Sequence, residues 1–152
     1  YDYFWTKIRV QGGAYGAFTG FNRNGFMYFG SYRDPNLKET LDVFDGTADY
    51  AANFTASERE MDKFIIGTMS GVDTPLTPMM KGDAAATCYL RGITEADRQQ
   101  RRDEILATRQ EDIRALAPLI DACMKENVLC VFGNDEKISE AKDVFGSIKP
   151  AL

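Results

Sequence analysis

Two short segments near the start of the chain intersperse large side chains with small ones. In residues 14–21 and 26–32, aromatic and β-branched residues alternate with glycine, alanine or serine, a pattern typical of half-buried strands. The four residues between them, Asn-Arg-Asn-Gly at 22–25, tolerate the positive φ of a tight turn. The sequence therefore predicts a β-hairpin.

Apolar residues at helical spacing occupy much of the remaining chain. A short helix is predicted over 3–11, ending at Gly12-Gly13, where a left-handed backbone conformation costs little. Further helices are predicted over 36–53, 57–71, 74–90, 108–127 and 136–148. Another helix is predicted to begin at Thr94.

Three local patterns refine these helices. Ser57-x-x-Glu60 has the form of a capping box and marks a helix start. Thr74-Pro75 is expected to open the next helix, because proline at the first helical position gives up only a donor that would be unpaired anyway. Pro118 lies inside the helix predicted over 108–127, where it removes a hydrogen bond and is expected to kink the helix.

The order of elements indicates the fold class. The continuous apolar run 128–132 has the length of a buried strand, which adds a third strand to the hairpin. Helix, hairpin, several helices, strand and helix in sequence predict an α+β fold with helices packed on one face of a mostly antiparallel sheet. So small a sheet has an exposed edge, through which missing strands or another chain are expected to pair.

Composition fits one globular domain spanning 1–152. The chain has 152 residues, 44% of them hydrophobic, and a net charge of −5. Neither nucleic acid nor membrane is expected as a partner, because binding to nucleic acid or anionic lipid requires clustered positive charge and no apolar run is long enough to span a bilayer. Arg98, Arg101 and Arg102 lie among acidic residues (Asp97, Asp103 and Glu104), which favours a solvated helix face over a nucleic-acid site.

The residue types present exclude most self-contained active sites. The chain has no histidine, the commonest general base and zinc ligand at neutral pH. Cys88, Cys123 and Cys130 are widely spaced, and we expect buried free thiols in a reducing compartment. Carboxylates show no metal-loop spacing, so no metal site is predicted in this chain.

The first residues are densely aromatic and resemble the interior of a buried element. We therefore expect a fragment of a longer polypeptide, whose domain is truncated at its N-terminus.

One motif resists a purely structural interpretation. It comprises Arg9-x-x-Gly12-Gly13-Ala14-Tyr15-Gly16, followed by 21–25 (Phe-Asn-Arg-Asn-Gly) and 31–36 (Ser-Tyr-Arg-Asp-Pro-Asn). Together these segments resemble the C-terminal half of presequence-degrading metallopeptidases, relatives of the insulin-degrading and pitrilysin-like enzymes known as inverzincins. The likeness extends across the helices to Lys149, although residues 9–36 carry most of it.

The resemblance implies a function that this chain shares with another part of the protein. In that family, two halves close around a chamber, and zinc is held in the N-terminal half by an inverted H-x-x-E-H motif and a distal glutamate. By motif match, Tyr15 is implied to contact the scissile carbonyl and stabilise its oxyanion. Arg9 is implied to bind a substrate carbonyl or to orient Tyr15.

Three functions stay open from the sequence. The first is the C-terminal domain of a zinc metalloendopeptidase for short or unfolded peptides, inactive in isolation and located in the bacterial cytoplasm or an organellar matrix. The second is a catalytically inactive scaffold or peptide-binding domain, like silent subunits of processing peptidases. The third is a free-standing interaction domain that self-associates through its sheet edge.

Overall fold

A computed structural model describes residues 2–22 and 24–150, so Arg23 of the predicted turn lies outside the described residues. The chain divides into two compact units. Unit 1 combines the part up to Asn53 with the part from Ala115, and unit 2 comprises Phe54–Arg114. The expected single domain over 1–152 stays a prediction, and each unit is described by itself.

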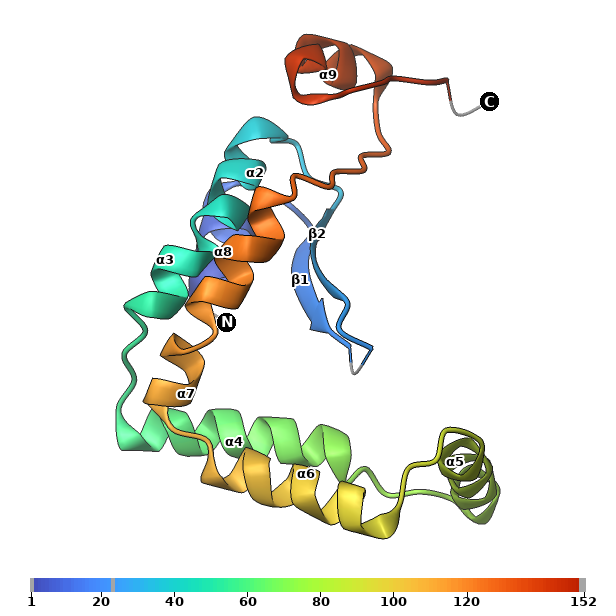
Figure 1. Cartoon of the computed structure of the whole chain (residues 1–152). Coiled ribbons are helices and arrows are strands. Elements are labelled where there is room, and N and C mark those ends of the chain that lie inside the picture. The colour runs from blue at the N-terminus through green and yellow to red at the C-terminus, as the bar shows by residue number, and fades with distance from the viewer. Residues whose placement is uncertain (1, 23, 151–152) are drawn as a thin grey trace. The chain divides into compact units, whose positions relative to one another are not determined.

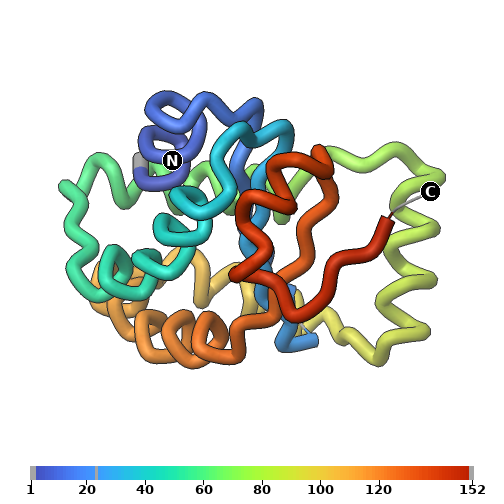
Figure 2. Tube along the Cα trace, turned by 90° about the horizontal axis from the view of Figure 1, so that it is seen from above, coloured from blue at the N-terminus to red at the C-terminus, as the bar shows by residue number. Residues whose placement is uncertain are grey.

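Unit 1 begins with the predicted N-terminal helix. α1 (Asp2–Phe4) continues directly into η1 (Trp5–Gln11), which is wound as a π-helix. Ile8 points inward from η1 and is only 1% exposed. Figure 2 shows this helical segment beside α2 (Lys38–Asp45), which it contacts. The helix ends at the predicted glycine pair, and Gly13 has a φ of +78°.

The predicted hairpin is confirmed. β1 (Gly16–Phe21) pairs antiparallel with β2 (Met27–Tyr32), in a register that sets Gly16 opposite Tyr32 and Phe21 opposite Met27. At the turn, Gly25 has a φ of +82° and its amide donates to the carbonyl oxygen of Asn22 at 2.9 Å. The structure is α+β, as predicted: mostly helical, with this small antiparallel sheet (Figure 1).

An aromatic cluster joins one face of the hairpin to the helices. Phe4 meets Phe29 of β2 and Phe44 of α2 edge-on, with ring centroids 5.5 and 5.6 Å apart, and Phe29 stacks on Phe44 at 5.7 Å. A second cluster joins α3 (Thr47–Ala52) to α8 (Ala117–Lys125) through small apolar residues and Ile120. These contacts leave the opposite face of the hairpin without helical cover from either cluster.

Two predicted helices are divided. The helix expected over 36–53 breaks at Gly46 into α2 and α3, at a point where a Cβ on Gly46 would lie 2.6 Å from the Tyr3 hydroxyl. The helix expected over 108–127 breaks into α7 (Gln110–Arg114) and α8. Pro118 lies in the first turn of α8, so it starts a helix where a kink was expected.

The third strand predicted over 128–132 was wrong. That segment has no regular secondary structure, and Val128 and Phe132 are 93% and 88% exposed. In the described part of the chain, β1 and β2 pair with each other alone, so the apolar run has no strand beside it to complete a ladder. The final helix is also shorter than predicted, as α9 (Asp135–Glu140) followed by the single turn η2 (Lys142–Val144).

Unit 2 is helical. Its first helix, α4 (Glu58–Val72), begins at the predicted capping box, in which Glu60 accepts from the Ser57 amide at 2.7 Å. α6 (Glu95–Ala107) packs along α4, and α5 (Pro78–Leu90) connects them (Figure 1). The predicted start of α5 at Thr74-Pro75 was wrong: Thr77 is the N-cap and Pro78 the first residue, the same pairing one turn later.

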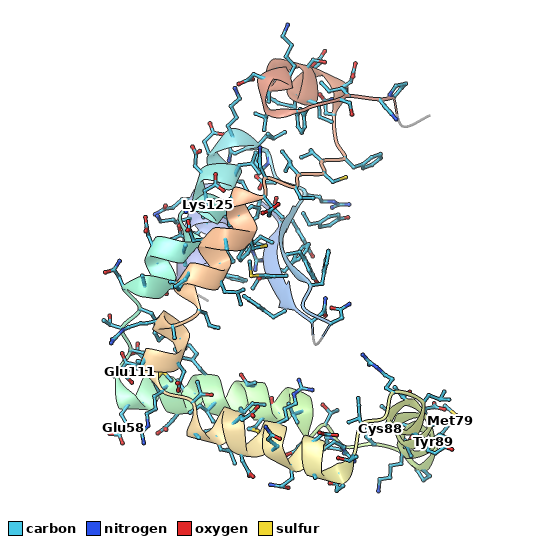
Figure 3. All side chains as sticks on the ribbon, viewed as in Figure 1. Glu58, Met79, Cys88, Tyr89, Glu111 and Lys125 are labelled. Atoms are coloured by element: carbon cyan, nitrogen blue, oxygen red, sulfur yellow. The ribbon has the colours of Figure 1, made fainter. Side chains whose placement is uncertain are left out.

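No buried side chain anchors α5. Met79 and Tyr89 project from it, 75% and 86% exposed (Figure 3).

In the described residues, no helix is long and apolar enough to cross a membrane.

Candidate functional site

Arg9 lies on η1, one residue after the buried Ile8. Its guanidinium carbon is 3.9 Å from the centroid of the Trp5 ring, a close cation–π contact with the preceding turn. The side chain is half-buried, so the aromatic ring restricts its direction while part of it stays accessible. A planar guanidinium held in this way can donate to a carbonyl or carboxylate oxygen.

A tight turn connects Arg9 to Tyr15. The amides of Gly12, Gly13 and Ala14 donate to the carbonyl oxygens of residues 7, 9 and 8, at 3.0, 2.9 and 3.1 Å. Three carbonyl oxygens at the end of η1 thereby accept hydrogen bonds from the amides of the turn that follows. A Cβ on Gly12 would lie 2.6 Å from the carbonyl oxygen of Ile8, so this winding requires glycine there.

Tyr15 follows the turn immediately before β1. Its amide donates to the carbonyl oxygens of Tyr32 at 3.1 Å and Arg33 at 3.3 Å, which fixes its backbone against the end of β2. Its side chain is 66% exposed, and its ring meets Tyr32 edge-on at 5.9 Å. The guanidinium carbon of Arg33 lies 6.0 Å from the Tyr15 ring centroid. The phenol is therefore presented from a fixed backbone without being enclosed.

The loop after β2 holds the turn from the other side. Asn36 donates through its side-chain amide to the Gly12 carbonyl oxygen at 2.5 Å. Asp34 orients this loop, because its two carboxylate oxygens accept from the Asn36 backbone N–H at 3.0 Å and from the hydroxyl of buried Thr40 at 2.6 Å. The segments 9–16 and 31–36, separate in sequence, thus form one hydrogen-bonded unit.

The structure therefore brings both predicted site residues to the same turn but gives them different aromatic neighbours. Arg9 stacks on Trp5, and Tyr15 contacts Tyr32 and Arg33. Segment 31–36 belongs to the sequence motif, but no role was predicted for it. The Asp-Pro-Asn run was the available signal, because Asp and Asn side chains after a strand commonly hydrogen-bond nearby backbone.

The described residues do not form a zinc site. No group of three or more His, Cys, Asp or Glu side chains among them could hold a metal ion. Because the whole sequence lacks histidine, the usual nitrogen ligand of zinc is missing as well. The chemistry that these residues offer is hydrogen-bond donation from a phenol and a guanidinium.

The arginines of α6 form ion pairs within unit 2. Arg98 pairs with Glu95 at 2.9 Å, and Arg102 pairs with Asp73, at the end of α4, at 2.7 Å. The hydrogen bond from Arg102 lowers the pKa of the Asp73 carboxyl, and the carboxylate in turn raises the pKa of Arg102. A cavity of about 360 Å³ beside them is remote in sequence from the turn that carries Tyr15. These pairs agree with the solvated helix face favoured by the sequence.

Comparison with known proteins decides the family. The family model described as the PreP C-terminal domain matches residues 1–133. The chain belongs to the PreP C-terminal domain family. Its motif resemblance to the C-terminal part of presequence proteases is thereby confirmed.

Relatives of this PreP C-terminal domain are much longer proteins. The chain is 47% identical over 152 residues to Protein HypA of Clostridium perfringens. The matched region is 100% of this chain and 16% of that protein. It is 38% identical to Presequence protease 1, chloroplastic/mitochondrial, of Arabidopsis thaliana, over 97% of this chain and 14% of that protein. Mitochondrial presequence protease of Xenopus laevis is 35% identical over 70% of this chain and 10% of its own length. The chain thus spans a small share of each relative.

Proposed function

We propose that this domain belongs to a zinc metalloendopeptidase that degrades short or unfolded peptides in a closed chamber, and that it contributes Arg9 and Tyr15 to substrate binding. The observation that carries the proposal is the presentation of Tyr15: an exposed phenol on a backbone fixed by two hydrogen bonds and a glycine turn. The family, and the presequence proteases among its relatives, supports the class of reaction.

Tyr15 is proposed to stabilise the transition state of peptide hydrolysis. As the scissile carbonyl becomes tetrahedral, its oxygen gains negative charge, and a phenol O–H aimed at that oxygen forms a stronger hydrogen bond than it does to the ground state. Preorganisation matters here because a donor that is already oriented costs no rearrangement during the reaction. The turn between Arg9 and Tyr15 supplies that preorganisation.

Arg9 is proposed to bind a backbone carbonyl of the substrate. Its stacking on Trp5 restricts the rotamers of a long side chain, which reduces the entropy lost when a peptide binds. Arg9 and Tyr15 would then fix two points along an extended peptide.

Zinc is proposed to be held by the N-terminal half of the same polypeptide, because the residues of this domain do not fit it. The inferred partners are that half and a peptide substrate. The proposed compartment is the bacterial cytoplasm or an organellar matrix, in keeping with bacterial, mitochondrial and chloroplast relatives.

The proposal is tested by peptidase activity on an unfolded peptide. Three samples are compared: this chain, the full-length polypeptide, and the full-length polypeptide stripped of zinc by a chelator and then reloaded. We expect cleavage by the zinc-loaded full-length protein alone, lost on chelation and restored on reloading. An inert zinc-loaded protein would instead support the catalytically silent peptide-binding scaffold.

A further inference from the structure

The face of the hairpin turned away from the aromatic core has a regular composition. On this face, each pair of facing residues joins one aromatic residue to one glycine: Gly16 with Tyr32, Phe18 with Gly30, and Gly20 with Tyr28. The three aromatic residues are 54%, 48% and 42% exposed in that order. We call Phe18, Tyr28 and Tyr32 the aromatic face.

Two of these rings lie over the glycines that face them across the sheet. A Cβ on Gly20 would come within 2.3 Å of the Tyr28 ring, and a Cβ on Gly30 within 2.4 Å of the Phe18 ring. Each ring therefore occupies the space above the facing glycine, and the two ring planes are inclined to each other by 69°. Phe18 and Tyr28 are also neighbours, with ring centroids 6.4 Å apart. Any larger residue opposite would displace the ring.

The aromatic face continues directly into the proposed site. Tyr32 covers no space above Gly16, where a Cβ would meet nothing within 4 Å, and contacts Tyr15 instead. From Tyr15 through Tyr32 to Phe18 and Tyr28, the rings follow the strand direction. Successive pairs on one face of a sheet are about 6.7 Å apart, the spacing of alternate side chains in an extended peptide.

We propose that the aromatic face is a docking surface for the apolar side chains of an extended peptide substrate, and that it favours peptides with aromatic or large apolar residues. This inference rests on the proposed function, which places the scissile carbonyl at Tyr15. An extended peptide held there has alternate side chains in register with Phe18 and Tyr28.

The chemistry of the face favours a transient peptide over permanent burial by another domain. Two of its three residues are tyrosines, and Tyr15 extends the row, so hydroxyl groups border the apolar surface. A permanently buried tyrosine requires a partner for its hydroxyl, whereas a surface that is alternately wet and covered does not. Arg33 lies 5.5 Å from the Tyr32 ring centroid, and aromatic residues with arginine are the types enriched where binding energy concentrates.

The test measures binding without cleavage. Full-length protein is stripped of zinc by a chelator, and the Kd is measured by fluorescence anisotropy for two labelled peptides of equal length. One carries phenylalanine at two alternate positions and the other carries alanine there. We expect the phenylalanine peptide to bind about 10-fold more tightly.

Variants then locate that preference. Phe18→Ala and Tyr28→Ala remove a ring, and Gly30→Ala keeps the Phe18 ring but forces it off the sheet. Each is expected to bring the two Kd values within about 2-fold of each other. Phe21→Ala is the matched control, because Phe21 is 52% exposed on the opposite face of the same strand, and it should leave the ratio unchanged.

An unchanged ratio in Phe18→Ala would overturn the inference. If Phe18→Ala does not fold, Phe18→Leu replaces it, and the ratio is expected to fall part of the way. A lower melting temperature with an unchanged ratio would assign the face to packing against the rest of the polypeptide, which also overturns it. Because no cleavage is measured, an inert full-length protein that still discriminates would contradict the proposed function and leave the peptide surface standing.

Discussion

Tyr15 is positioned through its backbone. Its amide is fixed by Tyr32 and Arg33, and the preceding turn is fixed by Asn36, while its side chain keeps 66% of its surface exposed. A residue placed in this way can lose its side-chain hydroxyl without disturbing the fold. The role of the phenol is therefore separable from stability.

We predict that Tyr15→Phe in the full-length protein lowers kcat by roughly 10- to 1,000-fold, because one hydrogen bond to the developing oxyanion is lost. The melting temperature should stay within about 1 °C of wild type, since the exposed hydroxyl makes little contribution to folding. Steady-state kinetics and thermal unfolding measure the two effects. Tyr89→Phe, at an 86% exposed position on α5, is the control. An unaltered kcat would remove Tyr15 from the mechanism.

The glycine turn gives a second prediction at the same scale. Gly13→Ala should lower the free energy of unfolding by about 1 to 2 kcal/mol, because an L-residue is strained at a φ of +78°. Urea unfolding measures the loss. Gly67→Ala on α4 is the matched control: a Cβ there meets nothing within 4 Å, and alanine is the better helix former. Equal destabilisation by both variants would contradict this account of the turn.

Between elements, α4 and α6 are joined by a charged contact at the surface. Arg102 donates from Nε to the Asp73 carboxylate at 2.9 Å, and its side chain is 22% exposed. The contact links the C-terminus of α4 to the middle of α6. The stability that such a pair contributes depends on pH, because the carboxylate must be ionised.

The sign of that dependence follows from the lowered pKa of Asp73. Arg102 stabilises the ionised carboxylate in the folded state, so this contribution is complete above the ordinary pKa of 3.8 and is lost as the pH falls through the lower folded value. We predict that Arg102→Gln is less stable than wild type at neutral pH and that the difference shrinks at more acidic pH. Urea unfolding across this range measures it, with the neighbouring Arg101→Gln as control. A difference that persists in acid would assign the effect to packing.

In the whole molecule, buried apolar side chains are unevenly distributed. Among the described residues, unit 1 holds most of them, and unit 2 holds Met61 alone. Those of unit 1 are Ile8, Ala14, Phe44, Ala51, Ala117, Ile120 and Ala141. Local stability depends on such burial, so the two units should differ in protection.

We predict slower amide hydrogen exchange in unit 1 than in unit 2. Amides of α2 and α8 should be protected longest, and those of α5 least, because α5 has no buried side chain and does not pack along α4 as α6 does. Exchange followed by mass spectrometry at peptide resolution measures this order. Protection of α5 equal to that of α8 would contradict it and indicate that α5 is covered in solution.

Sequence predicted the features that depend on neighbouring residues. The hairpin turn, the glycine stop after η1 and the capping box at Ser57 all follow from local backbone preferences. The family motif could also be identified from the sequence, because glycine, tyrosine and arginine at fixed spacing can be recognised without a structure. The roles of Arg9 and Tyr15 stay predictions.

Tertiary structure decided whatever required a partner distant in sequence. The apolar run 128–132 has a strand's composition, yet a strand forms only beside another strand's free hydrogen-bonding groups. The helix expected over 36–53 divides at Gly46, where the hydroxyl of Tyr3 occupies the space that a side chain would need. Likewise, Asn36 supports the Tyr15 turn, and rings lie over the facing glycines, only once folding sets the register. Sequence determined which local conformations were available, and long-range contacts selected among them because burial and hydrogen bonding are satisfied over the whole chain.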